Sequence, residues 1–200
     1  SAQKEIIDEE REILRKHVLG DPNLLQDDKH GKIWFQQDYR FETPKAYLKF
    51  RIHTPQVYST PRNAVLSQLY TDAISEGLNE FGYPVRLAGL RYGIDVDKKG
   101  IILTFSGYSG RILELIKKIS GRLKVITINK KTFSTLKEVR ARRYQNFHFK
   151  QPFQQAFYYR SLLLEGRKFS IMDYEKVIKG ISLNNLKKFA DEIFDRIYIE

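Results

Sequence analysis

The chain has 200 residues, a formal net charge of +11 and a hydrophobic share of 42%, with thirteen Phe and twelve Tyr. This length and composition are typical of a packed globular chain and exclude an intrinsically disordered one. The sequence contains no cysteine, which excludes disulfides, thiolate zinc sites and cysteine nucleophiles and leaves cytosol and bacterial periplasm both open. No apolar run approaches the roughly 20 residues of a membrane span, and the charged N-terminus shows no signal peptide.

The positive charge is concentrated in one part of the chain. Residues Arg111 to Lys168 include fifteen Lys and Arg but only three acids, whereas Glu5 to Glu12 carries five acids and one Arg. A basic segment of this kind attracts polyanions, or forms a solvated face that meets an acidic neighbouring domain. We favour the solvated face, because charge runs on helices are usually surface.

The N-terminal part predicts a peripheral element followed by a strand. Residues Gln3 to Val18 have the spacing of a weakly amphipathic helix, and Gly20 to Asn23 break it. We expect residues 1–31 to form a linker with an N-terminal helix. A strand is expected at Lys32 to Gln37, which opens the domain at residues 32–200.

The next segment gives the clearest pattern in the chain. Lys45 to His53 alternates apolar and polar residues, as a half-buried strand does. Thr60 followed by Pro61 is typical of a helix start, and Gly82-Tyr83-Pro84 is expected to end the pattern that follows. The helix that begins at Pro61 carries an apolar stripe at helical spacing, which predicts that it packs into the core. The stripe comprises Val65, Leu66, Leu69, Tyr70, Ala73, Ile74, Leu78 and Phe81.

The C-terminal half predicts one hairpin and several helices. Leu90–Val96 and Ile101–Ser106 read as its strands, with Gly100 at positive φ. Gly107 and Gly110 are expected to be turn glycines before a helix. Helices are expected at Ile112–Ile119, Thr132–Phe147, Pro152–Leu164, Asp173–Ile178 and Leu183–Phe194, with a short strand at Arg196–Glu200. The order predicts an α+β fold, with a mixed, largely antiparallel sheet and helices packed on one face.

Catalytic and metal-binding patterns are missing from the sequence. None of His17, His30, His53 and His148 begins an H-E-x-x-H or H-x-x-E-H motif. No phosphate-binding loop occurs, and Arg111 replaces the last glycine of a G-x-S-x-G elbow. We therefore predict no catalytic residue and no metal ligand in this chain. One patch on the expected basic helix is a candidate polyanion or interdomain site: Lys137, Arg140, Arg142 and Arg143.

Several separated motifs resemble the third (middle) domain of the insulysin/pitrilysin, or insulinase, family of zinc metallopeptidases. Residues 32–38 (KIWFQQD) match the family's K-x-W-[FY]-x-x-D, and residues 41–50 resemble its F-x-x-P-K-A-x-L-x-F strand. Residues 78–83 with 87–92 resemble L-N-E-x-x-Y-x-A-x-x-A-G-L-x-Y. Residues 151–163 resemble Q-P-x-x-x-A-x-Y-Y-x-x-L-L. The motifs keep the family's order from about Lys32 to Glu200.

The resemblance implies a non-catalytic role. In this family two bowl-like halves, each of two homologous α+β domains, enclose a chamber, and the H-x-x-E-H zinc site belongs to the first domain. The helix after Thr60 takes the topological place of the zinc helix, yet shows no ligands. The resemblance thus implies a structural domain that helps to form the chamber, inactive alone, with zinc held elsewhere in the longer enzyme. Its implied partners are the other domains of that polypeptide and, for the whole enzyme, peptide substrates.

Two alternatives remain open at this point. The chain could be a non-catalytic partner subunit, like the inactive chains of mitochondrial processing peptidase and the respiratory core proteins. The third possibility, a nucleic-acid-binding module, is suggested only by a sequence pI near 9.7. It is the least favoured, because RNA readers display aromatic residues within a basic strand face, whereas the densest basic segment here is expected to be helical.

Overall fold

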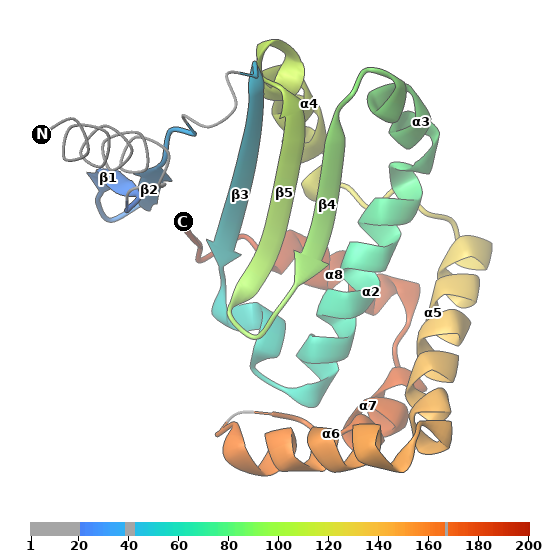
Figure 1. Ribbon diagram of the computed structural model, residues 1–200. Helices are drawn as coiled ribbons and strands as arrows, with labels where there is room; N and C mark the ends of the chain where they lie inside the picture. Colours follow the sequence, from blue (N-terminus) through green and yellow to red (C-terminus); the bar gives the residue numbers. More distant parts are fainter. Residues whose placement is uncertain (1–20, 39–42, 167) are drawn as a thin grey trace, which may run out of the picture.

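The computed structural model describes residues 21–38, 43–166 and 168–200 (Figure 1). The helix expected at Gln3–Val18 lies outside the described residues. The strands are β1 (Asn23–Asp27), β2 (Lys32–Phe35), β3 (Lys45–His53), β4 (Arg91–Val96), β5 (Gly100–Tyr108) and β6 (Tyr198–Ile199). The helices are η1 (Pro55–Tyr58), α2 (Pro61–Gly77), α3 (Asn79–Leu87), α4 (Ser109–Leu123), α5 (Lys130–Gln145), η2 (Asn146–Phe149), α6 (Pro152–Leu164), α7 (Ile171–Ile178) and α8 (Leu183–Glu192).

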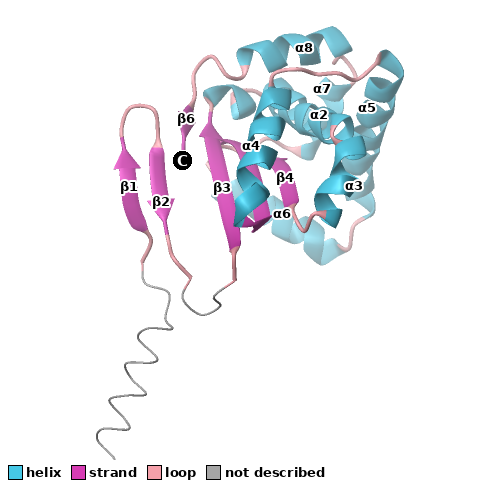
Figure 2. Ribbon diagram, turned by 90° about the horizontal axis from the view of Figure 1, so that it is seen from above, coloured by secondary structure: helices cyan, strands magenta, loops and turns pink. Residues whose placement is uncertain are grey.

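The larger sheet is antiparallel, with the strand order β4-β5-β3-β6, and β1 and β2 form a separate antiparallel pair. Parallel pairing occurs among the described residues as an isolated bridge between Gly31 and Ile199. The helices gather on one face of the larger sheet, and the other face is open (Figures 1 and 2). This arrangement confirms the predicted α+β class with a largely antiparallel sheet.

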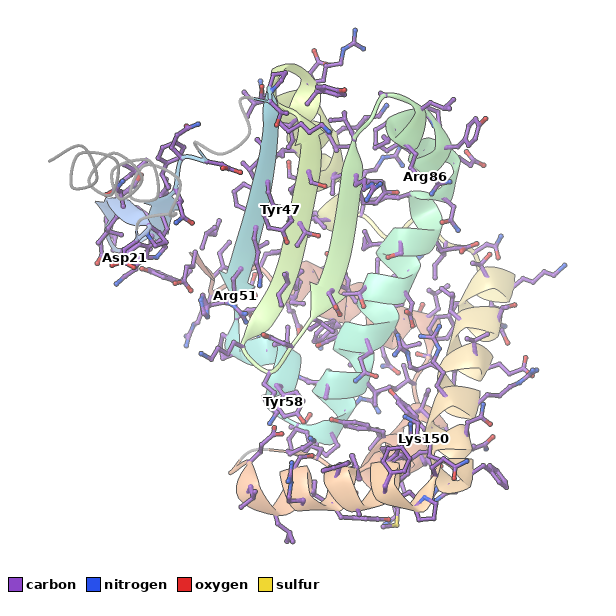
Figure 3. All side chains as sticks on the ribbon, viewed as in Figure 1. Asp21, Tyr47, Arg51, Tyr58, Arg86 and Lys150 are labelled. Carbon is purple, nitrogen blue, oxygen red and sulfur yellow. The ribbon has the colours of Figure 1, made fainter. Side chains whose placement is uncertain are left out.

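Alternation along the strands decides which residues enter the core. Ile52 faces Ile101 and Phe50 faces Leu103 across the β3–β5 pair, on the side that the helices cover. On the other side of β3, Tyr47 is exposed, and Arg51 forms an ion pair with Asp97 (Figure 3). The predicted strand at Lys45–His53 is therefore confirmed in both its bounds and its facing.

Helix α2 is the central helix of the core. The Thr60 hydroxyl accepts a hydrogen bond of 3.1 Å from the backbone N–H of Asn63, and Pro61 occupies the first turn, as predicted. The apolar stripe is buried from Val65 to Leu78, while Phe81 is partly buried. Tyr70 donates its hydroxyl hydrogen to the carbonyl of Leu123, and burial raises the pKa of its phenol.

Three local expectations were wrong. Gly82 and Pro84 lie inside α3, and the break falls earlier, at Leu78, whose N–H closes α2 and whose C=O accepts from Phe81 and Gly82. The segment Asn23–Asp27, expected to be linker, is strand β1. Gly100 does not have positive φ. It is glycine because a Cβ there would lie 1.9 Å from the carbonyl oxygen of Ile52.

Of the two predicted turn glycines, Gly110 lies inside α4, so that expectation was wrong, whereas Gly107 has the predicted conformational role. Its φ is 135°, in the region that favours glycine, and a Cβ there would lie 2.5 Å from the carbonyl oxygen of Gly89. The close approach lets β5 turn directly into α4.

Among the described residues, no helix is both long and apolar enough to cross a bilayer.

We predict that Leu69→Ala lowers the free energy of unfolding by about 2–5 kcal/mol, because Leu69 is 1% exposed and its loss leaves a cavity. The control is Leu113→Ala in α4, where the side chain is 65% exposed, so little change is expected. Denaturant midpoints measure both. Equal midpoints for the two variants would contradict the packing of α2.

Candidate functional site

Helix α2 carries polar groups that are committed to internal contacts. The Ser67 hydroxyl is buried, with the carbonyl oxygens of Val57 at 2.9 Å and Asn63 at 2.8 Å as the two acceptors within reach of its one hydrogen. Asp72 binds Arg140 through both carboxylate oxygens. Among the described residues, no three His, Cys, Asp or Glu side chains gather where they could hold a metal ion. The buried side chains and internal hydrogen bonds of α2 pack this helix into the core.

The histidines within the described ranges lie on the surface beside acids or near turns. His53 contacts the Glu200 carboxylate at 3.1 Å, and His148 contacts Glu175 at 3.2 Å. Hydrogen bonds from the His53 ring and, secondarily, from the Trp34 indole hold the pKa of Glu200 below its ordinary value. Each is a single pair of one imidazole with one carboxylate at or near the surface.

A hollow of about 640 Å³ lies at the end of the sheet where β3 meets η1. Its lining includes His53, Tyr58, Lys98, Lys99 and Arg196, and contains no carboxylate. Lys98 pairs with Glu165 from the segment after α6. The hollow thus offers cations, hydroxyls and the His53 imidazole.

The four residues of the predicted basic patch separate into two pairs. Lys137 donates to the backbone carbonyls of Lys179, at 2.9 Å, and Ile181, at 2.8 Å, just after α7. Arg140 forms a bidentate ion pair with Asp72, with nitrogen–oxygen distances of 2.6–2.9 Å, and the Arg140 side chain is only 16% exposed. Both residues therefore fix α5 to its neighbours in the core.

The other pair points outward. Arg142 is exposed and forms an ion pair with Glu138 one turn earlier on α5, while Arg143 is exposed next to the buried Tyr144. The structure does not bring the four cations together on one free face. Binding of a polyanion or of a neighbouring domain at Arg142 and Arg143 stays a prediction. Arg140 binds Asp72, and Lys137 binds the backbone carbonyls after α7. These partners are far away in sequence, so the spacing of residues along α5 could not predict them.

We predict that Arg140→Ala lowers the free energy of unfolding by about 1.5–3 kcal/mol, because it leaves the Asp72 carboxylate without its charged partner. Arg142→Ala is the matched control, since it removes the same charge from the same helix at an exposed site and should leave stability nearly unchanged. Thermal or urea unfolding compares them. Equal losses would show that the Arg140–Asp72 pair adds nothing beyond an ordinary surface charge.

Comparison with known proteins places this arrangement in a family. The family described as "Middle or third domain of peptidase_M16" matches residues 7–177. The insulin-degrading enzyme of Homo sapiens is 33% identical over 187 residues, which is 94% of this chain and 18% of that protein. The peroxisomal insulin-degrading enzyme-like 1 of Arabidopsis thaliana is 31% identical over 179 residues, 90% of this chain and 18% of that protein.

The fold comparison agrees. The crystal structure of pitrilysin aligns with a TM-score of 0.82 at 18% identity, over 89% of this chain and 19% of that one. This chain therefore spans less than a fifth of the length of the relatives it matches. With the α+β fold and the family match over most of its length, the chain belongs to the insulinase-type M16 peptidases as their middle, or third, domain.

Proposed function

We propose that this chain is a non-catalytic structural domain of a zinc-dependent metalloendopeptidase and helps to form the closed chamber in which that enzyme degrades peptides. The zinc would be held in the first domain of the longer protein. The partners of this domain would be the other domains of the same polypeptide. The names of the relatives, as insulin-degrading enzymes, support peptides as the substrate class of the longer protein.

The observation that carries the proposal is the surface of α6. No residue of this helix is buried. Phe153 and Phe157 are 60% and 56% exposed, and Leu163 and Leu164 are 85% and 77% exposed. Phe149, just before the helix, is 87% exposed. The rings of Phe153 and Phe157 are in edge contact, and exposed apolar groups that gather in this way mark protein interfaces.

Helix α6 is nevertheless held firmly on its inner side. The hydroxyl of Tyr158 accepts a hydrogen bond of 2.8 Å from the backbone N–H of Ile171, and its ring contacts Phe147 at 4.5 Å between centroids. Burial raises the pKa of the Tyr158 phenol. A helix that is anchored on one side and apolar on the other is suited to a fixed interface with another domain. It is less suited to a mobile lid.

The alternatives differ in what they require of this surface. A non-catalytic partner subunit would also need an apolar interface, so α6 fits it equally. The longer sequence around this chain separates the two, because an upstream H-x-x-E-H supports the single-chain peptidase. A nucleic-acid-binding module gains nothing from an apolar helix, and the separation of the α5 cations removes its densest basic cluster.

We predict that the double variant Phe157→Ser, Leu164→Ser leaves the unfolding midpoint of this chain alone unchanged, because both side chains are exposed. In the longer protein the same variant should lower both the thermal midpoint and the rate of peptide hydrolysis. Gln154→Ser, an exposed polar position on the same helix, is the control. Unchanged stability and hydrolysis in the longer protein would remove α6 from the interface.

We also predict that the isolated chain neither retains stoichiometric zinc nor hydrolyses peptides, because no ligand set of the family's type occurs in its sequence. Metal analysis after washing with a chelator and dialysis against zinc measures the first. Incubation with a fluorogenic peptide measures the second. One zinc per chain together with chelator-sensitive hydrolysis would overturn the non-catalytic assignment.

A further inference from the structure

Three segments that are far apart in the sequence meet at the hollow beside the C-terminal end of β3 (Figure 1). Pairing of β3 with β6 brings Arg196, which lies just before β6, to this end of the sheet. The turn of the β4–β5 hairpin brings Lys98 and Lys99 to the same end, and the Lys99 carbonyl accepts a hydrogen bond of 3.2 Å from the backbone N–H of Thr54. Cations from two distant parts of the chain therefore line one hollow.

Carboxylates of the chain itself already contact the basic groups of this lining. Glu165, from the segment after α6, forms an ion pair with Lys98. The Glu200 carboxylate lies 3.1 Å from the His53 ring nitrogen. Neither glutamate lines the hollow. Ammonium, guanidinium and imidazolium groups bind carboxylates through charge-assisted hydrogen bonds, so the lining is built from groups that recognise carboxylates.

Two cations of the lining have no carboxylate partner within the described part of the chain. Lys99 and Arg196 are both exposed, and no acid of the described residues forms an ion pair with either. Asp97 in the hairpin turn is engaged by Arg51 and by two backbone N–H groups of the turn. Two like charges beside one hollow repel each other, and an anion bound near both would offset that repulsion.

The rest of the lining is held in place and is partly apolar. The Tyr58 ring stacks on Phe169 at 4.9 Å between centroids, and its hydroxyl lies 3.0 Å from that of Tyr174 (Figure 3). Pro55 and Ile197 add apolar surface to the lining. A ligand that fills the hollow therefore needs an apolar group as well as negative charge. An inorganic anion has no apolar group, whereas a peptide with acidic and apolar side chains has both.

We propose that this hollow binds an acidic segment of a peptide. A carboxylate of the peptide lies beside Lys99 and Arg196, and an apolar side chain next to it contacts Pro55 and Ile197. The source of the peptide rests on the proposed function, since it would be a substrate inside the chamber of the longer protein. The hollow then holds one part of the substrate and favours peptides that carry acidic residues, while hydrolysis takes place in another domain.

The test measures the binding of two labelled peptides to this chain at low salt. The acidic peptide is Ala-Glu-Glu-Phe-Glu-Glu-Ala, and the neutral control is Ala-Gln-Gln-Phe-Gln-Gln-Ala, which keeps the apolar side chain. The variant is Lys99→Ala with Arg196→Ala. Its matched control is Lys131→Ala with Arg111→Ala, which removes the same charge at exposed positions that do not line the hollow. Unfolding midpoints establish that each variant is folded.

The acidic peptide is expected to bind more tightly than the neutral one. The Lys99 and Arg196 variant should weaken its binding about five- to tenfold, because two exposed ion pairs are lost, and the matched control less than about twofold. Equal binding of the two peptides would overturn the proposal, and so would equal losses in the two variants. Tripolyphosphate that binds more tightly than the acidic peptide, and is lost in the same variant, would also overturn it and would make the hollow a phosphate site.

Hydrolysis by the longer protein tests the role of the hollow separately from its binding. The Lys99 and Arg196 variant is expected to raise the KM of the acidic peptide relative to that of the neutral peptide about fivefold, and the matched control to leave this ratio unchanged. An unchanged ratio in the first variant would overturn the role in substrate selection. A longer protein that hydrolyses neither peptide would contradict the proposed function instead, and the binding measured on this chain would stand.

Discussion

Helix α2 buries nine side chains and contacts η1, β4, α5, α7 and α8. Its apolar stripe and the inward side chains of β3 and β5 belong to one cluster of buried residues, so the sheet and the helical layer share one core. Polar groups on the same helix are satisfied internally, by Val57 for Ser67 and by Arg140 for Asp72. A buried helix with this many fixed polar contacts tolerates little rotation or displacement.

This constraint bears on the role of the domain. In the position that the family resemblance gives to a metal-binding helix, α2 places packing groups and a carboxylate neutralised by a guanidinium. These groups give α2 a structural role in the core. That role agrees with an apolar α6 surface held from behind by Tyr158. The exposed apolar side chains of α6 lie at the periphery of the domain, where other parts of a longer chain would contact it.

Much of the fold was predictable because the signals were local. The alternation in Lys45–His53 and the Thr60-Pro61 start depend only on neighbouring residues, and the structure reproduces both. β1 was missed because all five of its residues are exposed and show no alternation. The constraint on Gly100 comes from the carbonyl of Ile52, and the anchoring of Arg140 comes from Asp72. Both partners are distant in sequence, so no pattern around the residue itself reveals them.

The bridge between Gly31 and Ile199 joins residues near opposite ends of the described chain. Contacts of such long sequence separation form late in folding, because the loop they close carries the largest entropic cost. Helices α2 to α8 and the β4–β5 hairpin can assemble before it. The N-terminal hairpin then docks last, onto a strand at the other end of the chain. During synthesis the N-terminal hairpin would stay undocked, with Trp34 and Phe35 exposed to solvent, until β6 has left the ribosome. In the nascent protein these two side chains are therefore an exposed apolar surface that favours aggregation.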